Sequence, residues 1–250
     1  MTELVSLIVP LFNEEKGIPL LVERLSQLRE RLLPEYELEC VLVDDGSRDN
    51  TVETAAAAFS GFPGVRIVKH GVNRGAGAAM RTGFQNASGK FLCTIDADCT
   101  FDPLEIPDLL KAMEREQVDI AIGSPYHPRG GVENVVPWRL FLSKGASLMH
   151  RGVSRSRLYS YTSFLRVYRR HVLDNVQFDS DGFVAVTELL MKALLVGYTA
   201  VEVPTVLRRR ITGVSKMNVY RNVIAHARLA ASVMYWRFTA SVARSAPKPI

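Results

Sequence analysis

The sequence predicts an α/β fold in which a mostly parallel sheet carries helices on both of its faces. Through the first half of the chain, short apolar runs rich in β-branched residues alternate with helical patterns, as consecutive βαβ units do. The chain has 250 residues, 47% of them hydrophobic, so it can bury a large core without disulfides or structural metals. We therefore expect one α/β domain followed by a helical tail.

Five strands and four helices are predicted in this first half. The strands are Leu4–Leu11, Leu38–Val43, Val65–Lys69, Phe91–Ile95 and Asp119–Ile122. Helical patterns fill the intervals, near Lys16–Leu32, Asn50–Phe59, Gly75–Ala87 and Leu104–Glu116. In sheets of this kind ligands bind beyond the carboxyl ends of the strands, so the residues that follow each strand are the place to look for chemistry.

The pattern changes after residue 123. A loop rich in proline and glycine covers Ser124–Pro137, a helix is predicted near Trp138–Arg151, and Gly152–Gly182 shows no regular pattern. Val184–Leu195 predicts a helix, Tyr198–Val203 a strand, and the residues from Lys216 onward a long helix. We expect residues 1–215 to form the main domain and residues 216–250 an amphipathic tail.

Several classes of protein are disfavoured by composition. The three cysteines, Cys40, Cys93 and Cys99, lie too far apart for a CxxC motif, which disfavours a zinc or disulfide framework and favours a reducing compartment. No basic segment precedes the first apolar run, and no run reaches the roughly 18–20 residues of a membrane-spanning helix. The net charge of +5 is weak evidence for nucleic-acid binding, and we expect no nucleic-acid partner.

Acidic residues follow two of the predicted strands. Asp44 and Asp45 end the second strand, and Asp96 and Asp98 follow the fourth. Carboxylates at positions i and i+2 can both reach one divalent cation, and acids in such an apolar stretch are costly unless they are paired or bind metal. The sequence therefore predicts that Asp96 and Asp98 hold Mg²⁺ or Mn²⁺ together with substrate phosphates.

A glycine-rich segment follows the third predicted strand. Gly75 and Gly77 form a GxG sequence, but Met80 stands where a dinucleotide-binding fingerprint needs its third glycine. This disfavours a dehydrogenase and leaves open a loop whose backbone approaches a ligand. The sequence also lacks a GxSxG elbow, a phosphate loop and a helical histidine pair, which disfavours serine hydrolases, ATPases and zinc enzymes.

Four ordered motifs resemble those of family 2 glycosyltransferases, and more narrowly the dolichyl- or polyprenyl-phosphate mannosyltransferase branch. They are Pro10–Glu14, Asp44–Thr51, Asn73–Gly83 and Asp96-Ala97-Asp98. The similarity continues to Lys216. It implies that residues 1–215 form a single Rossmann-like catalytic domain of the GT-A type, which binds a nucleoside diphosphate sugar.

The resemblance also implies roles for individual residues. Asp96, Ala97 and Asp98 would hold the metal and the diphosphate. The cations Arg139, Arg151, Arg210 and Lys216 would surround the phosphates of donor and acceptor and, with Asp98, form the catalytic set, whereas Arg208 and Arg209 are expected to be solvated. The nucleotide-binding residues would be Pro10, Phe12, Glu14, Val43, Asp44, Asp45, Gly75, Asp96 and Ala97.

The predicted reaction is a metal-dependent, inverting transfer of a hexose, mannose or glucose-like, to a polyprenyl or dolichyl phosphate. An acceptor phosphate is largely dianionic at pH 7, so positioning replaces a general base. The alternative acceptor is a hydroxyl of a glycan, glycolipid or small molecule, which needs a carboxylate base such as Asp179, Asp181 or Glu188. A binding module without turnover is the alternative from another class.

The C-terminal tail carries apolar residues at helical spacing from Val219 to Val242, with arginines at polar positions. Such a helix either packs on its own domain or lies on a membrane surface. A lipid-linked acceptor favours the membrane surface. We therefore expect a cytoplasmic protein bound peripherally to the cytoplasmic face of a membrane.

Overall fold

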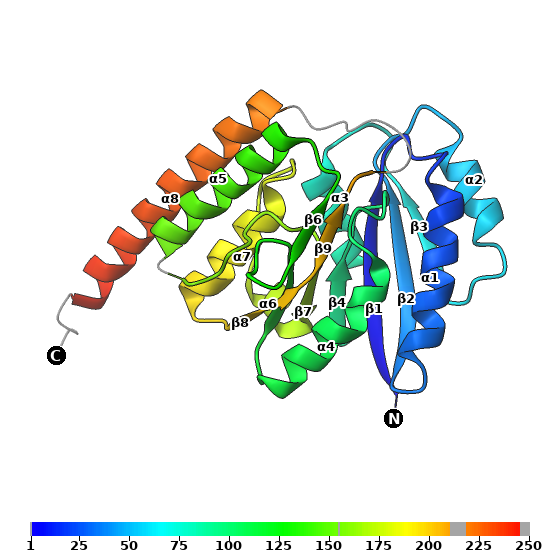
Figure 1. The fold of residues 1–250 in the computed structure, drawn as a ribbon, viewed down its shortest axis with the longest axis horizontal. Helices are drawn as coiled ribbons and strands as arrows, with labels where there is room; N and C mark the ends of the chain where they lie inside the picture. Colours follow the sequence, from blue (N-terminus) through cyan, green and yellow to red (C-terminus); the bar gives the residue numbers. More distant parts are fainter. Residues whose placement is uncertain (1, 155, 211–218, 246–250) are drawn as a thin grey trace.

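A seven-stranded sheet forms the centre of the molecule (Figure 1). The computed structural model describes residues 2–154, 156–210 and 219–245. The strand order is β3-β2-β1-β4-β7-β5-β8, and all neighbours are parallel except β7, which runs antiparallel to both β4 and β5. The strands are β1 Glu3–Leu11, β2 Tyr36–Asp44, β3 Val65–Lys69, β4 Phe91–Thr94, β5 Ile120–Ser124, β7 Arg166–Arg169 and β8 Ala200–Pro204. The predicted mostly parallel α/β fold is confirmed.

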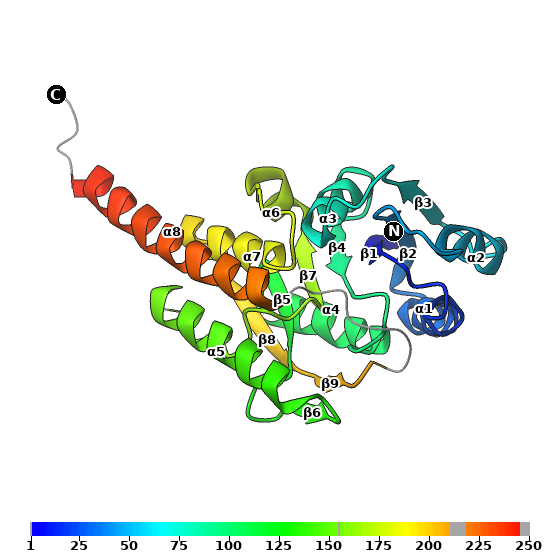
Figure 2. The same cartoon turned by 90° about the horizontal axis from the view of Figure 1, so that it is seen from above.

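Helices cover both faces of this sheet (Figure 2). One layer contains α1 (Ile18–Leu32), α2 (Thr51–Ala58) and α4 (Ile106–Arg115), the last preceded by the 3₁₀ turn η1 (Pro103–Glu105). The other contains α3 (Ala76–Gln85), α6 (Arg170–Asn175) and α7 (Ala185–Val196).

Side-chain alternation along the strands and helical spacing build these layers. In β2, Cys40 and Leu42 pack in the α1 layer, whereas Val41 and Val43 pack against Ala79 of α3. In α1 the leucines at positions 21, 25, 28 and 32 are all buried, each contributing about 1.5–3 kcal/mol relative to exposure.

The segment Gly152–Gly182 differs from expectation, because it contains β7 and α6. The sequence of β7 is RVYR, and Arg166 at its start is fully buried. Its guanidinium donates to the carbonyls of Tyr161 and Val186, so a charged residue occupies a core position. The prediction of no regular structure is therefore wrong here. Two further short strands, β6 (Gly131–Glu133) and β9 (Val206–Arg208), pair with each other in a separate parallel ribbon.

Two long helices lie side by side at one end of the molecule (Figures 1 and 2). They are α5 (Pro137–Ser154) and α8 (Val219–Ser245). The buried residues Leu229, Ala230 and Val233 pack α8 against the rest of the fold, while Tyr235 and Phe238 are 66% and 70% exposed. Among the described helices, none is long and apolar enough to cross a membrane. The predicted domain boundary at 215/216 lies outside the described residues.

Candidate active site

The carboxyl ends of β1, β2 and β4 border a cleft of about 660 Å³, where the fold class predicts a ligand. Its lining includes most of the predicted nucleotide-binding and metal-binding residues. They are Pro10, Phe12, Glu14, Asp45, Gly75, Asp96, Ala97 and Asp98. Strands far apart in the sequence therefore bring these side chains to one opening.

Asp45 organises the loop on the β2 side of the cleft. Its buried carboxylate accepts hydrogen bonds from the backbone N–H groups of Arg74 and Gly75, at 2.9 and 2.7 Å. The same carboxylate lies 2.8 Å from Nδ1 of His70, whose Nε2 is 2.9 Å from the Thr82 hydroxyl. Asp45 therefore ties β2 to the start of α3.

The glycines of this loop permit a close approach within the chain itself. Gly75 has a φ of +99°, and a Cβ there would lie 2.3 Å from the carbonyl oxygen of Asp181. A Cβ on Gly77 would lie 2.2 Å from the carbonyl oxygen of Ser180, and the Gly77 N–H donates to Asp181. The glycine requirement is therefore explained by the packing of Ser180 and Asp181 on the start of α3.

Asp98 lies at the centre of a charge network. Arg210 Nε donates to Asp98 Oδ2 at 2.7 Å, and Arg210 Nη2 donates to Glu14 Oε1 at 2.5 Å. The N–H of Thr100 donates to the other Asp98 oxygen at 3.0 Å. Arg210 reaches this place because the Arg208 N–H donates to the Thr100 carbonyl at 2.8 Å, which fixes the end of β9 beside the Asp98 turn.

Asp96 is the second acid of the predicted metal pair. Burial and then the negative charge of Asp98 raise the pKa of its carboxyl well above the usual value. A divalent cation between the two carboxylates would relieve both effects, so the residues fit the predicted Mg²⁺ or Mn²⁺. Among the described residues, no group of three or more His, Cys, Asp and Glu side chains is arranged for a metal. Two carboxylates suit a cation that takes its other ligands from substrate phosphates and water.

Three of the predicted site residues that the structure describes do not line the cleft. Val43 is fully buried in the sheet, and Asp44 holds the turn after β2 by accepting from the N–H groups of Gly46 and Ser47. The Arg151 guanidinium stacks on the ring of Tyr159, 5.1 Å from its centroid. Lys216 lies outside the described residues.

The sequence predicts that Arg208 is solvated, but in the structure its side chain has partners on the protein. It forms ion pairs with Glu133 at 3.5 Å and with Glu105 at 4.0 Å. Arg208, Arg209 and Arg210 all line the cleft, but Arg208 and Arg210 differ in their partners. Arg210 contacts Asp98 and Glu14, and Arg208 joins β9 to Glu133 and Glu105.

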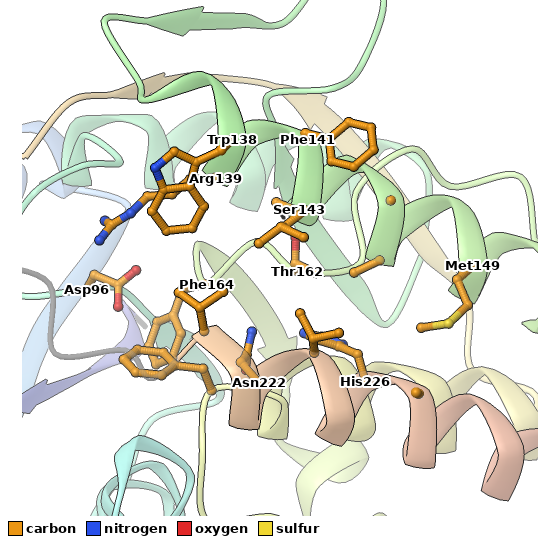
Figure 3. Close-up of a pocket in the computed structure, with 17 residues that line it drawn as sticks. Asp96, Trp138, Arg139, Phe141, Ser143, Met149, Thr162, Phe164, Asn222 and His226 are labelled. Atoms are coloured by element: carbon orange, nitrogen blue, oxygen red, sulfur yellow. Dashed lines mark hydrogen bonds between the residues drawn. The ribbon is translucent and has the colours of Figure 1, made fainter.

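A second, apolar pocket of about 360 Å³ opens from the cleft between α5 and α8 (Figure 3). It begins at Asp96 and Arg139 and extends along the two helices to Met149. Residues that line both cavities are Asp96, Trp138, Arg139, Ser143, Phe164 and Phe183. From the sequence, only Asp96 and Arg139 among these are predicted as site residues, because neither apolar nor hydroxyl side chains show in the sequence that they line a pocket.

Residues 6–177 match the model of the family described as glycosyl transferase family 2. The match covers more than half of the chain and contains the acids of the cleft. The chain belongs to this family. The sugar-transfer activity and the resemblance inferred from the four motifs are thereby confirmed.

Curated relatives of this glycosyltransferase include lipid-phosphate enzymes. It is 35% identical over 225 residues to the polyprenol monophosphomannose synthase of Mycolicibacterium smegmatis, covering 87% of this chain and 82% of that protein. It is 32% identical over 234 residues to the dolichol-phosphate mannosyltransferase of Pyrococcus furiosus, covering 93% of this chain. The matched region spans 64% of the length of that second relative.

Solved structures of other glycosyltransferases share the fold. The glucosyl-3-phosphoglycerate synthase of Mycobacterium tuberculosis, in complex with Mn²⁺, UDP and phosphoglyceric acid, superposes with a TM-score of 0.67 at 19% identity, covering 94% of this chain and 78% of that chain. A mannosyltransferase of Pyrobaculum calidifontis, in complex with GDP-mannose and Mn²⁺, gives 0.64 at 18% identity, covering 100% and 66%. The predicted GT-A type of fold is confirmed.

Proposed function

We propose that this glycosyltransferase transfers a hexose, mannose or glucose-like, from a nucleoside diphosphate sugar to a polyprenyl phosphate, with inversion and with Mg²⁺ or Mn²⁺. The observation that carries the proposal is the junction of two unlike cavities at Asp96. A cleft lined with acids and arginines meets an apolar pocket that has Arg139 at its entrance. The names of both curated relatives agree with a lipid phosphate as the acceptor.

The donor fits the cleft. Phe12 and Pro10 offer apolar contacts for a nucleoside, and Glu14 and Asp45 line the same opening. Asp96 and Asp98 would hold the cation, which neutralises charge on the leaving diphosphate. Arg210 supplies a fixed positive charge beside Asp98 and Glu14. Burial lowers the pKa of Arg210, but the negative charges of these two acids outweigh burial and leave the pKa raised.

The acceptor fits the second pocket. A lipid phosphate has one anionic group and a long apolar chain, and Arg139 offers the guanidinium for the first while the space between α5 and α8 suits the second. A hydroxyl acceptor on a sugar would need polar walls and a base. The pocket walls beyond Arg139 are mostly aliphatic and aromatic, including Phe141, Leu142 and Ala146.

The three carboxylates that a hydroxyl acceptor would require as a base are engaged elsewhere. Glu188 accepts from the N–H groups of Asp179 and Ser180, at 3.1 and 2.9 Å, and pairs with Lys192 at 2.7 Å. Burial favours a raised pKa for Glu188, but these donors outweigh it and lower the pKa. Asp179 pairs with Lys192, and Asp181 with Arg81. None of the three lines the cleft or the pocket.

The surface beside the pocket supports action at a membrane. Neither α5 nor α8 contains an aspartate or glutamate, and both carry arginines. Several of their large apolar side chains are exposed, among them Trp138, Phe141, Leu148, Tyr220 and Phe238. Such a basic and apolar surface suits an anionic bilayer, with each basic residue contributing up to about 1 kcal/mol. The cysteines are all free, which supports the cytoplasmic face.

Product analysis with a panel of donors and acceptors tests the proposal. We expect transfer to polyprenyl phosphate in the presence of Mg²⁺ or Mn²⁺, detected by product mass, with a sugar–phosphate bond that mild acid cleaves. Transfer only to hydroxyl acceptors, giving an acid-stable glycoside, would overturn it.

Two glycines on α5 provide a matched pair of variants for the acceptor pocket. Gly145 lines the pocket and Gly152 does not, and a Cβ at either position meets nothing within 4 Å. Gly145→Leu should raise the KM for polyprenyl phosphate and leave the donor KM unchanged. Gly152→Leu should change neither, and equal effects of the two variants would count against the pocket as the acceptor site.

Vesicle sedimentation tests the membrane surface. The double variant Phe141→Ser and Phe238→Ser removes two exposed apolar side chains, 76% and 70% accessible, without touching the core. We expect salt-sensitive binding of the wild-type protein to anionic vesicles and weaker binding of the variant. Wild-type protein that stays in the supernatant at low salt would contradict this part of the proposal.

A further inference from the structure

A belt of polar side chains crosses the otherwise apolar pocket between α5 and α8. It consists of Ser143 on α5, Thr162, and Asn222 and His226 on α8 (Figure 3). The hydroxyls of Ser143 and Thr162 lie 2.7 Å apart. These two hydroxyls satisfy each other. The Asn222 amide and Nε2 of His226 would lose hydrogen bonds to water without replacement if the cavity held only a hydrocarbon chain. The polar belt therefore indicates a polar part of the ligand at this depth.

Asn222 and His226 extend from α8 toward α5 and into the pocket (Figure 3). They are four residues apart, so they lie on the same face of the helix. Within the described residues, neither the Asn222 amide nor Nε2 of His226 has a hydrogen-bond partner on the protein. These two groups are available to a ligand.

His226 is joined to a second histidine behind it. Nδ1 of His226 lies 3.0 Å from Nε2 of His150 on α5, and the side chains are almost completely buried. Burial lowers the pKa of both imidazoles to about 4. Both rings are therefore neutral near pH 7, and each carries one proton on one of its two nitrogens.

The surroundings of His150 determine which nitrogen carries the proton. Nδ1 of His150 is buried and has no hydrogen-bond partner. A proton there would be an orphaned buried donor, which is rarer in proteins than an orphaned acceptor. His150 therefore keeps its proton on Nε2 and donates it to Nδ1 of His226. His226 must then carry its own proton on Nε2, the nitrogen left for the pocket.

We infer that His226, held in its Nε2–H tautomer by His150, donates a hydrogen bond to the phosphate of the acceptor, with the Asn222 amide as a second donor beside it. His226 is a binding residue and His150 a positioning residue. This inference rests on the proposed function, since it assigns the polar belt to the head group of a lipid phosphate. The apolar chain then continues past the belt toward Met149.

Two substitutions at His226 separate binding from structural support. Gln places an amide N–H near the former Nε2 and loses the acceptor for His150, whereas Asn keeps an acceptor near the former Nδ1 and loses the donor to the pocket. We expect His226→Asn to raise the KM for farnesyl phosphate about tenfold with an unchanged donor KM. His226→Gln should keep the acceptor KM within about threefold and lower the melting temperature.

The opposite order, with Gln more harmful to the acceptor KM than Asn, would overturn the inference and leave a structural role. His171→Asn, at an exposed histidine on α6, is the control and should change neither KM. If the wild-type protein transfers to no lipid phosphate at all, the proposed function itself fails, which is a different result.

The tautomer is measurable without activity. Two-bond ¹H–¹⁵N spectra of histidine-labelled protein should show His226 and His150 both protonated at Nε2. Farnesyl phosphate should shift the His226 Nε2 signal, and inorganic phosphate should do so only at much higher concentration. A His226 protonated at Nδ1 would refute the arrangement, even if the variants failed to fold.

Discussion

Arg210→Lys is the most direct test of the charge network in the cleft. In the structure one planar guanidinium donates to Asp98 at 2.7 Å and to Glu14 at 2.5 Å, with only 20% of its side chain exposed. Lysine keeps the charge but offers a single nitrogen, which cannot occupy both positions of the fork. One charge-assisted hydrogen bond is therefore lost, worth about 1.5–3 kcal/mol.

This loss corresponds to a decrease in kcat/KM of roughly 10- to 150-fold, measured by product mass with saturating metal. Arg208→Lys is the matched control, because Arg208 lies two positions away, is 42% exposed and pairs with Glu133 and Glu105 rather than with the acids of the cleft. It should change kcat/KM less than about threefold. Equal losses at both positions, with both proteins folded by thermal unfolding, would refute the assignment of Arg210.

Three further predictions concern single carboxyl groups. Asp98→Asn should abolish transfer while preserving the fold, and EDTA should abolish it reversibly; full activity of chelator-treated protein would contradict a metal site. Burial raises the pKa of Glu105 from 4.5 to about 7, so stability from this group is lost as the pH rises through that range. Glu105→Gln should therefore reduce the fall in melting temperature between pH 5 and 8, by a few degrees. Glu188→Gln should lower the melting temperature by a few degrees and retain kcat, whereas a collapse of kcat would restore Glu188 as a base.

Most of the sheet was predictable because its strands are apolar and its helices periodic. Strand β1 and the second half of β2, from Cys40 onward, are buried on both faces and read as nearly continuous apolar runs. The acids of the cleft were predictable for the same reason, since Asp45, Asp96 and Asp98 interrupt or end such runs.

The rest depends on contacts that leave no local pattern. β7 was missed because Arg166, its first residue, is satisfied by distant carbonyls instead of by solvent. The resemblance to the family also placed Arg151 at the site. In the structure Arg151 lies twelve residues after Arg139 on α5 and stacks on Tyr159. His226 gave no signal at all, because its partner His150 lies 76 positions earlier in the sequence.

The position of β7 has a consequence for how the chain reaches its fold. This strand is the only link in the sheet between β4 and β5 among the described residues, and it is completed only at residue 169. A chain emerging from the ribosome therefore holds β4 with one open edge, and β5 without either of its neighbours, until that point. Unpaired parallel edges are sites of association with other chains. A fragment ending before Arg166 should consequently aggregate, although it contains both acids of the predicted metal pair.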